Sequence, residues 1–265
     1  MLAWAVFFSA LPILLLVFVL TWVVQRFFLA HNDAGIVDVV WSPSLAVTAI
    51  YYAVMVDGDA TRQLILIAMA CFWGFRLGWH VYTDRIVGKP EDARYVQMRE
   101  EWGDRVQLWF FVFYQIQALA AWVLSLGFFI IASDPSGFVW LSPLTMLAFV
   151  LFVVSFVGEA TADNQLSAFK RDPANKGKVC REGLWAYSRH PNYFFEWVIW
   201  LSYIALGLLA PMGWLTIVPA AVILLFLTLM SGIPNNEAQN LRSKPEAYRV
   251  YQSEVSAFFP WFPKR

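Results

Sequence analysis

Long apolar blocks, each close to the length of a membrane span and separated by charged stretches, constrain this chain more than any other feature. An α-helix needs about 20 consecutive apolar residues to cross the hydrocarbon core of a bilayer. The candidate spans are residues 2–24, 36–56, 63–83, 106–132, 138–160, 194–210 and 212–232. We therefore expect an all-α polytopic membrane protein: a bundle of seven transmembrane helices that forms one membrane-embedded domain over residues 1–265.

The composition agrees with the bilayer as solvent and excludes several classes of protein. Hydrophobic residues make up 60% of the chain and charged residues only 14%, whereas soluble domains carry roughly 25% charged residues. The formal net charge is zero, so we expect no nucleic-acid partner. Cys71 lies in an apolar block and Cys180 in a polar loop, which predicts free thiols and no metal site. The first block lacks a basic start, so we interpret it as a retained helix.

Basic residues predict the orientation of the bundle. Residues 84–105, 161–192 and 233–265 carry most of the Lys and Arg, whereas the connections 56–62 and 132–141 hold a single basic residue between them. Because Lys and Arg concentrate on the cytoplasmic side, the three basic segments belong inside. An odd number of spans then places the N-terminus outside and the C-terminus in the cytosol, with the three segments forming a cap over the helix ends.

The loop that enters the sixth predicted span is the most informative stretch. It reads Gly-Leu-Trp-Ala-Tyr-Ser-Arg-His-Pro-Asn-Tyr-Phe-Phe-Glu-Trp over residues 183–197. Arg189, His190 and free N–H groups at a helix start could bind an anionic group. Asn192 and Glu196 are four residues apart and share a helix face, and carboxylates inside a membrane are usually functional. The alternative is that Arg189 and His190 lie at the headgroup level and Glu196 pairs with a basic neighbour.

A second candidate cluster lies at the cytosolic end of the fifth predicted span. Glu159 and Asp163 share one helix face. Lys170 and Arg171 follow a turn or two later, where paired cations could hold a phosphate. Ordinary salt bridges at a helix end are the alternative explanation.

Two further clusters lie in the first half of the chain. Arg76 lies about two turns inside the end of the third span, so we expect it to face the bundle interior and an anionic partner. Arg85, Lys89 and the run Glu91-Asp-Ala-Arg-Tyr95 follow it. Asp38 and Trp41 share a face near the start of the second span, where Asp38 could donate a proton or polarise a carbonyl if burial raises its pKa; an aspartate in interfacial water is the alternative.

The end of the seventh span offers amides and an acid. The run Asn235-Asn-Glu-Ala-Gln-Asn240 suits hydrogen bonds to a ribose or an amide, although helix capping explains it equally well. No GxGxxG, GxxxxGK[ST], HExxH or CxxC motif is present, so a Rossmann domain, a P-loop and a zinc site of those kinds are not supported. A nucleotide would have to be held by helix ends and loops.

These motifs together resemble a known family. Gly183-Leu-Trp-Ala-Tyr187, Arg189-His-Pro-Asn-Tyr193 and Glu196-Trp, with Tyr248-Arg-x-Tyr251 and Phe258-Phe-Pro-Trp261, look like the bacterial, 3-oxo-5-alpha-steroid 4-dehydrogenase-like branch of the steroid 5-alpha-reductase family. Glu91-Asp-Ala-Arg-Tyr95 and Asp38-x-x-Trp41 fit that branch too. The resemblance spans most of the chain.

The resemblance implies an integral protein of the bacterial inner membrane that binds NADPH on its cytosolic side and admits a lipid-like enone from the bilayer. A hydride would pass to the β-carbon of the enone while an acid polarises the carbonyl. The substrate that the resemblance implies is a 3-oxo-Δ4 steroid. The residues expected to be catalytic are Asp38, Trp41 and Glu196. Those expected to hold the cofactor are Arg76, Arg85, Lys89, Asp92, Arg94, Tyr95, Asp163, Lys170, Arg171, Tyr187, Arg189, His190, Asn192, Tyr193, Glu196, Glu237 and Asn240.

The sequence departs from the family in one respect and leaves other functions open. The eukaryotic enzymes carry a Gln-Glu pair in the second helix and a tyrosine before the arginine of the third, where this chain has Asp38 and Trp73. The natural substrate and the carbonyl-polarising acid are therefore open. The Arg-His-Pro-x-Tyr loop also resembles isoprenylcysteine methyltransferases, which bind S-adenosylmethionine, and sterol reductases. A transporter is disfavoured because the halves show no matched repeats, and no obligate protein partner is expected.

Overall fold

The computed structural model describes residues 3–29 and 33–264, and over these residues the chain forms helices and no strand. This confirms the predicted all-α class; Leu2, where the first predicted span begins, lies outside the described residues. The chain divides into two compact units. The first comprises Met1–Trp140 and Leu206–Pro219, and the second Leu141–Ala205 and Ala220–Arg265. The single domain over residues 1–265 stays a prediction.

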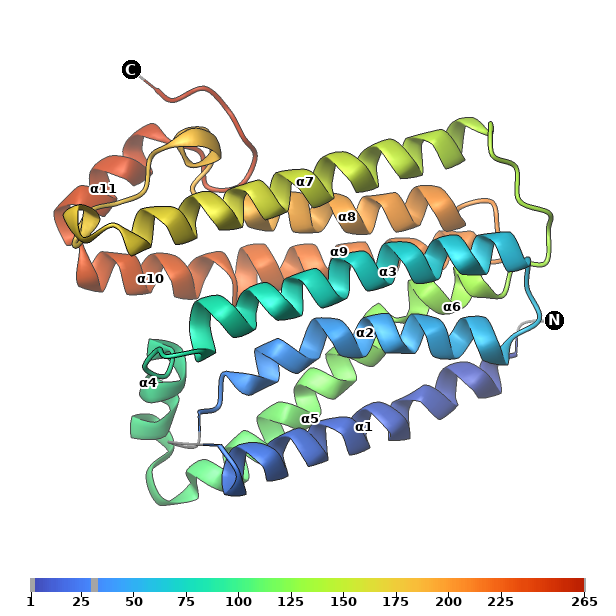
Figure 1. Ribbon diagram of the computed structural model, residues 1–265, viewed down its shortest axis with the longest axis horizontal. Coiled ribbons are helices and arrows are strands. Elements are labelled where there is room, and N and C mark those ends of the chain that lie inside the picture. The colour runs from blue at the N-terminus through green and yellow to red at the C-terminus, as the bar shows by residue number, and fades with distance from the viewer. Residues whose placement is uncertain (1–2, 30–32, 265) are drawn as a thin grey trace. The chain divides into compact units, whose positions relative to one another are not determined.

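The first unit is built from six α-helices with short connections (Figure 1). They are α1 (Trp4–Phe27), α2 (Ile36–Met55), α3 (Ala60–Val81), α4 (Ala93–Trp102), α5 (Val106–Leu124) and α6 (Leu126–Ala132). A π-helical turn, Tyr82–Ile86, extends α3, and the 3-10 turns Gly103–Arg105 and Gly213–Thr216 complete the unit. Within it α2 packs along α3, and α1 along α5.

Two glycines explain how closely α2 and α3 approach each other. A Cβ atom on Gly74 would lie 2.6 Å from the Ser42 carbonyl oxygen, and one on Gly78 would lie 2.6 Å from Cγ of Pro43. Small residues let helix backbones come together where lipid offers no hydrophobic driving force. The pair of glycines therefore fixes the α2–α3 contact from the α3 side.

A buried ion pair closes one end of the first unit. The Arg62 guanidinium lies 3.1 Å from the Asp134 carboxylate, with side chains 9% and 1% exposed. Arg62 also donates to the carbonyl oxygens of Leu206 and Ser136, each at 3.3 Å. This arginine is the basic residue of the predicted outer connections, and its charge is balanced inside the protein.

The second unit contains α7 (Pro143–Arg171), α10 (Ile233–Ser243) and α11 (Pro245–Glu254), together with most of α8 (Pro191–Gly207) and α9 (Ile217–Leu225). The helix α7 starts with Pro143 after Ser142, whose hydroxyl accepts a hydrogen bond from the Thr145 amide at 3.1 Å, a standard N-cap. A π-helical turn, Phe226–Met230, follows α9. The short 3-10 turns Pro173–Asn175 and Gly183–Ala186 lie in the connection between α7 and α8.

Within residues 3–29 and 33–264, six helical segments are long and apolar enough to cross a membrane, by length and composition. They are Trp4–Phe27, Ile36–Met55, Ala60–Ile86, Ala93–Ala132, Pro143–Arg171 and Gly213–Ser243. The sixth predicted span, residues 194–210, corresponds to α8, which has only 17 residues and is shorter than the roughly 20 that span a bilayer. The predicted count of seven and the orientation stay predictions.

Element boundaries differ from those expected. The span predicted at 106–132 is divided at Ser125 into α5 and α6, and the Ser125 hydroxyl lies 2.9 Å from that of Tyr52. The span predicted at 138–160 continues as α7 to Arg171. The expected polar tail from residue 233 forms the helices α10 and α11.

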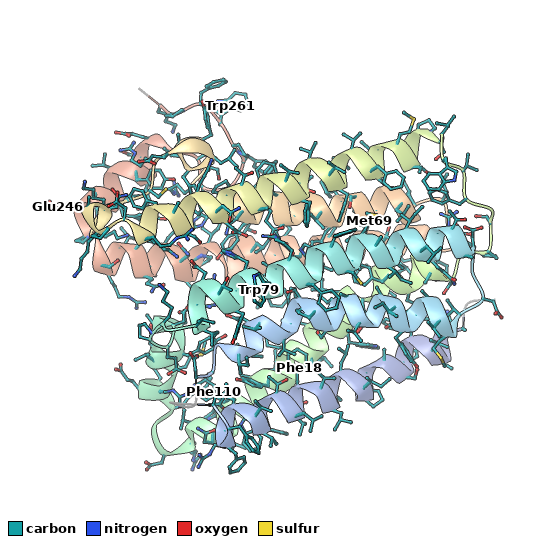
Figure 2. The ribbon with its side chains drawn as sticks, viewed as in Figure 1. Phe18, Met69, Trp79, Phe110, Glu246 and Trp261 are labelled. Carbon is teal, nitrogen blue, oxygen red and sulfur yellow. The ribbon has the colours of Figure 1, made fainter. Side chains whose placement is uncertain are left out.

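Apolar side chains are divided between the core and the outer surface (Figure 2). Phe18 and Phe110 are fully buried, whereas Trp79 is 68% exposed. On α7 the apolar residues Val150, Val153, Val154 and Val157 are all exposed. A helix with such an exposed apolar face is what a lipid environment accommodates.

Candidate functional site

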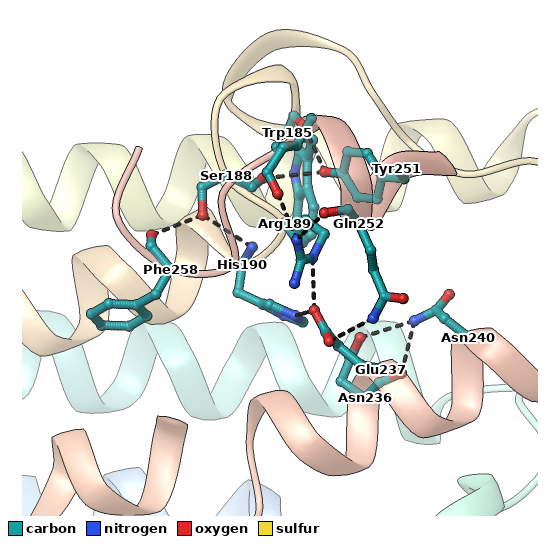
Figure 3. Close-up of polar contacts among 11 residues, drawn as sticks. Trp185, Ser188, Arg189, His190, Asn236, Glu237, Asn240, Tyr251, Gln252 and Phe258 are labelled. Carbon is teal, nitrogen blue, oxygen red and sulfur yellow. Dashed lines mark hydrogen bonds and ion pairs between the residues drawn. The ribbon is translucent and has the colours of Figure 1, made fainter. Parts of the chain in front are cut away.

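Arg189 is the centre of a hydrogen-bond network in the second unit (Figure 3). Its Nε donates to Oε1 of Glu237 on α10 at 2.7 Å. One terminal nitrogen donates to the carbonyl oxygens of Gln252, at 3.1 Å, and Val255, at 2.5 Å, at the end of α11. Gln252 Nε2 donates to the second Glu237 oxygen at 2.8 Å. The guanidinium predicted to bind an anionic ligand is thus largely engaged in holding α10 and α11 to the loop.

His190 is buried next to the same carboxylate. Its Nε2 lies 3.4 Å from Oε1 of Glu237, its ring stacks on that of Tyr193 with centroids 5.3 Å apart, and the residue is 2% exposed. Burial lowers the pKa of His190 below its ordinary 6.5, an effect that Arg189 reinforces and Glu237 opposes. A neutral imidazole is therefore favoured.

The loop before α8 is fixed to the C-terminal segment by further hydrogen bonds. The Tyr251 hydroxyl donates to the Trp185 carbonyl at 2.5 Å, and the Ser188 hydroxyl donates to the Phe258 carbonyl at 2.8 Å. The Ser188 oxygen also accepts from the His190 amide at 3.1 Å. The loop is held rigidly at the start of α8, which presents Asn192 and Glu196 in fixed positions.

Polar residues from α7 and α8 meet inside the second unit and form what we call the polar ladder: Glu159, Asp163, Asn192 and Glu196. Asn192 Nδ2 donates to Oδ1 of Asp163 at 3.2 Å. The helices α7 and α8 run in opposite directions. Glu159, four residues before Asp163, and Glu196, four residues after Asn192, therefore both lie about one helical turn beyond this contact on the same side. There Glu196 accepts a hydrogen bond from Trp200 Nε1 at 3.0 Å. Glu159, Asp163 and Glu196 are 2%, 5% and 6% exposed.

Close packing holds the two helices of the ladder together. A Cβ atom on Gly158 would lie 2.6 Å from the ring of Phe195. Asn192 Oδ1 is buried, and among residues 3–29 and 33–264 nothing donates a hydrogen bond to it. A buried amide oxygen without a donor is costly, on the order of 1–3 kcal/mol, so it marks a place where a ligand group could be received.

The remaining predicted residues of the second unit lie around this core. Lys170 and Arg171 are exposed at the last turn of α7, where Arg171 Nε donates to the Ser167 carbonyl at 3.1 Å. Tyr187 is 42% exposed and its ring is 5.9 Å from that of Phe262. Asn240 on α10 donates to the backbone and side chain of Asn236, both at 2.9 Å. These hydrogen bonds within α10 agree with the alternative explanation that Asn240 serves local helix capping.

In the first unit, Asp38 lies at the centre of a second cluster. It receives hydrogen bonds from Tyr95, at 2.9 Å to Oδ1, and from Arg94, at 2.9 Å to Oδ2. Arg85 lies 3.6 Å away. Arg94 also pairs with Asp92, the N-cap of α4, at 3.1 Å. Both carboxylate oxygens of Asp38 are thus occupied, and polarising a substrate carbonyl with this group would require a contact to break.

The opposite charges in this cluster stabilise one another. Burial raises the pKa of Asp92, but Arg94 and Arg85 lower it more, so it falls below its usual 3.8. Glu91, next to Asp92, pairs with Arg99 at 2.7 Å and accepts from the Ala34 amide at 2.8 Å. The run predicted from the sequence therefore folds as an interlocked ion-pair network that links α2 to α4.

Trp41, Arg76 and Lys89 are the other predicted residues of the first unit. Trp41 Nε1 is buried, and no acceptor for it is found among the described residues. Arg76 lies on α3 and is partly buried, and the anionic partner expected for it stays a prediction. Lys89 is exposed in the turn before α4. The structure joins Asp38 to Arg85, Asp92, Arg94 and Tyr95.

For two residues of the network, the sequence predicted no functional role. Gln252 bridges to Glu237, and Tyr251 anchors the loop. The Tyr-Arg-x-Tyr motif pointed to this helix as part of the resemblance, but nothing in its spacing indicates the partners. A helical period places Tyr248 and Gln252 on one face, which is the available signal for Gln252.

Comparisons with known proteins give a family and two relatives. A family profile described as "Protein of unknown function (DUF1295)" matches residues 21–255. An uncharacterized protein of Schizosaccharomyces pombe is 28% identical over 76% of this chain and 64% of its own length. A protein of Ustilaginoidea virens named "Probable O-methyltransferase ustE" is 36% identical over 29% of this chain and 26% of its own length. The chain thus spans less than two thirds of either relative, and no solved structure matches.

Proposed function

Because the chain belongs to the DUF1295 family, whose description assigns no activity, we propose its function from the arrangement of its residues: an NADPH-dependent reductase of the C=C bond of an α,β-unsaturated ketone in a lipid-like substrate. A 3-oxo-Δ4 steroid is the proposed model substrate, and the resemblance to steroid 5-alpha-reductases supports this choice. The six described helical segments that are long and apolar enough to cross a membrane support a substrate that arrives from the bilayer.

The observation that carries the proposal is the buried Asn192 Oδ1 without a donor. The carboxamide of nicotinamide has an NH2 group that could donate to this oxygen, while the carboxylates of the ladder are acceptors for further donors. Asp163 orients the amide through its 3.2 Å hydrogen bond. The residues present therefore fit a nicotinamide, and the cofactor would supply a hydride to the β-carbon of the enone.

The cation positions support a phosphate-bearing cofactor beyond the ladder. Lys170 and Arg171 follow Asp163 by seven and eight residues on the continuous helix α7, which is a rise of roughly 10–12 Å. Both are exposed, so they are accessible to the phosphates of a nucleotide. We assign Arg189 to holding α10 and α11, because Glu237, Gln252 and Val255 already accept its hydrogen bonds.

Within the first unit, Trp41 has an unused hydrogen-bond donor, whereas Asp38 is an acceptor that its neighbours already occupy. The indole N–H is buried without an acceptor among the described residues, so a carbonyl oxygen in its reach would satisfy it. Asp38 instead accepts from Tyr95 and Arg94. We propose that the Trp41 N–H is a hydrogen-bond donor for an oxygen of the lipid-like substrate, and that the Asp38 cluster holds the start of α2 in place.

A methyltransferase is the second candidate, because a partial relative carries the printed name of a probable O-methyltransferase. S-adenosylmethionine has no phosphate group, so a methyltransferase has less use for Lys170 and Arg171. The same amide oxygen on Asn192 could accept from the amino group of S-adenosylmethionine. Measuring binding of both cofactors distinguishes the two functions.

The test uses purified protein in detergent with NADPH, progesterone and, in parallel, S-adenosylmethionine. Steroid-dependent NADPH oxidation is expected, and Asn192→Ala should weaken NADPH binding by about 5- to 150-fold, the equivalent of roughly 1–3 kcal/mol. The matched control is Asn164→Ala, an amide on the exposed face of α7, which should bind NADPH normally. Binding of S-adenosylmethionine with no response to NADPH refutes the reductase.

A further inference from the structure

The segment after α11 is a loop without helix or strand that several backbone hydrogen bonds hold in place. Its Ser256 carbonyl accepts from the Arg189 amide at 2.8 Å, its Trp261 amide donates to the Tyr187 carbonyl at 2.9 Å, and its Lys264 amide donates to the Glu254 carbonyl at 2.8 Å. Pro260 and Pro263 flank the Trp-Phe pair and restrict the backbone further. The side chains of this segment are therefore presented in fixed positions.

Four aromatic side chains on this surface are exposed, and we call them the aromatic ridge: Tyr187 (42%), Phe259 (58%), Trp261 (71%) and Phe262 (75%). Trp261 lies at the outside of the second unit (Figure 2). An ordered chain that holds rings of this size toward the outside has an exposed apolar surface that needs a partner.

The ridge continues the surface of α8. Phe259 lies 5.9 Å, between ring centroids, from Phe194 and 6.1 Å from Trp197, both in the first two turns of that helix. The neighbouring Phe195 packs on Gly158 of α7, and the exposed apolar residues of α7 reach Val157. The ridge is thus level with the end of the apolar face of a candidate membrane span.

We propose that the aromatic ridge is a membrane anchor that inserts into the headgroup region of the lipid bilayer. Tyr and Trp are enriched at this depth because each has an apolar ring and a polar group. Lys264 follows the ridge, and a cation there suits anionic lipid headgroups. The anchor holds the C-terminal segment, and with it the loop before α8, against the membrane surface.

The experiment places a nitroxide label on Phe262→Cys in the full chain, reconstituted in vesicles of phosphatidylcholine and phosphatidylglycerol. Power saturation compares collisions of the label with oxygen, which partitions into lipid, and with a water-soluble nickel chelate. Glu246→Cys, on the exposed side of α11, is the matched control, and the signal of labelled protein with only Cys71 and Cys180 is subtracted. Phe259→Cys serves as a second position if the first variant does not fold.

The expected result is an oxygen-to-nickel collision ratio several-fold larger at position 262 than at position 246. Equal ratios at the two positions would mean that the ridge lies in water and would overturn the proposal. Low collision rates with both reagents would mean that protein covers the ridge, from a second copy or another partner, and would overturn it equally.

Discussion

Replacing Glu237 with alanine tests whether the Arg189 network holds the C-terminal helices in place. The Arg189 and Glu237 side chains are only 11% and 16% exposed, and the variant leaves the guanidinium with no carboxylate beside it. Breaking a buried pair costs about 3–5 kcal/mol, whereas exposed pairs contribute about 0–1. Since both side chains keep some contact with solvent, we expect a loss of about 2–3 kcal/mol.

Hydrogen exchange measures this loss locally. The amides to follow are those of Arg189, Tyr248 and Val255, whose acceptors are the carbonyls of Ser256, Lys244 and Tyr251. If the C-terminal helices open as one unit, their exchange should accelerate by about 30- to 150-fold in Glu237→Ala. Amides of α2 and α3 in the first unit should exchange as before.

Two further variants control the interpretation. Glu237→Gln keeps one acceptor oxygen but presents an NH2 group to either Arg189 or Gln252, so it should lose part of the protection and not all. Glu246→Ala removes an exposed carboxylate from α11 and should change exchange little. If Glu237→Ala accelerates exchange at Tyr248 by less than about threefold, the pair contributes no more than an exposed one and does not hold the C-terminal helices.

Two other predictions concern the same unit. Because the pKa of His190 is lowered in the folded protein, the unfolded chain binds a proton at His190 more readily, and stability should fall as the pH drops below about 6.5. Thermal unfolding of the native protein and of His190→Gln between pH 7.5 and 5.5 measures this dependence, and an equally steep loss of stability in the variant would contradict the prediction. Gly158→Ala would press a methyl group into the Phe195 ring and should lower the free energy of unfolding by about 1–3 kcal/mol. The control is Gly137→Ala, whose added methyl group meets open space, and equal stability of the two variants would show that α7 and α8 can separate at no cost.

The spacing of residues within a helix predicted which polar side chains share a face. The four-residue spacing of Asn192 and Glu196, and of Glu159 and Asp163, placed each pair on one helix face. The structure adds that these two faces meet, through the 3.2 Å hydrogen bond from Asn192 to Asp163. Which helix a polar face packs against depends on the path of the chain between α7 and α8, and the spacing of residues within one helix carries no such information.

The roles of the charged groups could not be predicted because charge alone does not reveal its partner. Arg189 and Lys170 are both cations of predicted cytosolic segments, yet Arg189 is engaged by Glu237 and backbone carbonyls from α11, while Lys170 is exposed. Asp38 was predicted as an acid, and the structure surrounds it with Tyr95, Arg94 and Arg85 from more than 40 residues away.

The sequence by itself determined that this is a helical membrane protein, because the cost of placing unpaired backbone and charge in hydrocarbon leaves long apolar helices as the solution for such a composition. It also determined which segments are rich in polar groups. Only the tertiary structure decided which of those groups form hydrogen bonds or ion pairs within the protein. Others, such as Asn192 Oδ1, keep hydrogen-bonding capacity for a ligand. The physical reason is that hydrogen bonds and ion pairs act over a few ångströms, so their formation depends on the packing of segments that are distant in the chain.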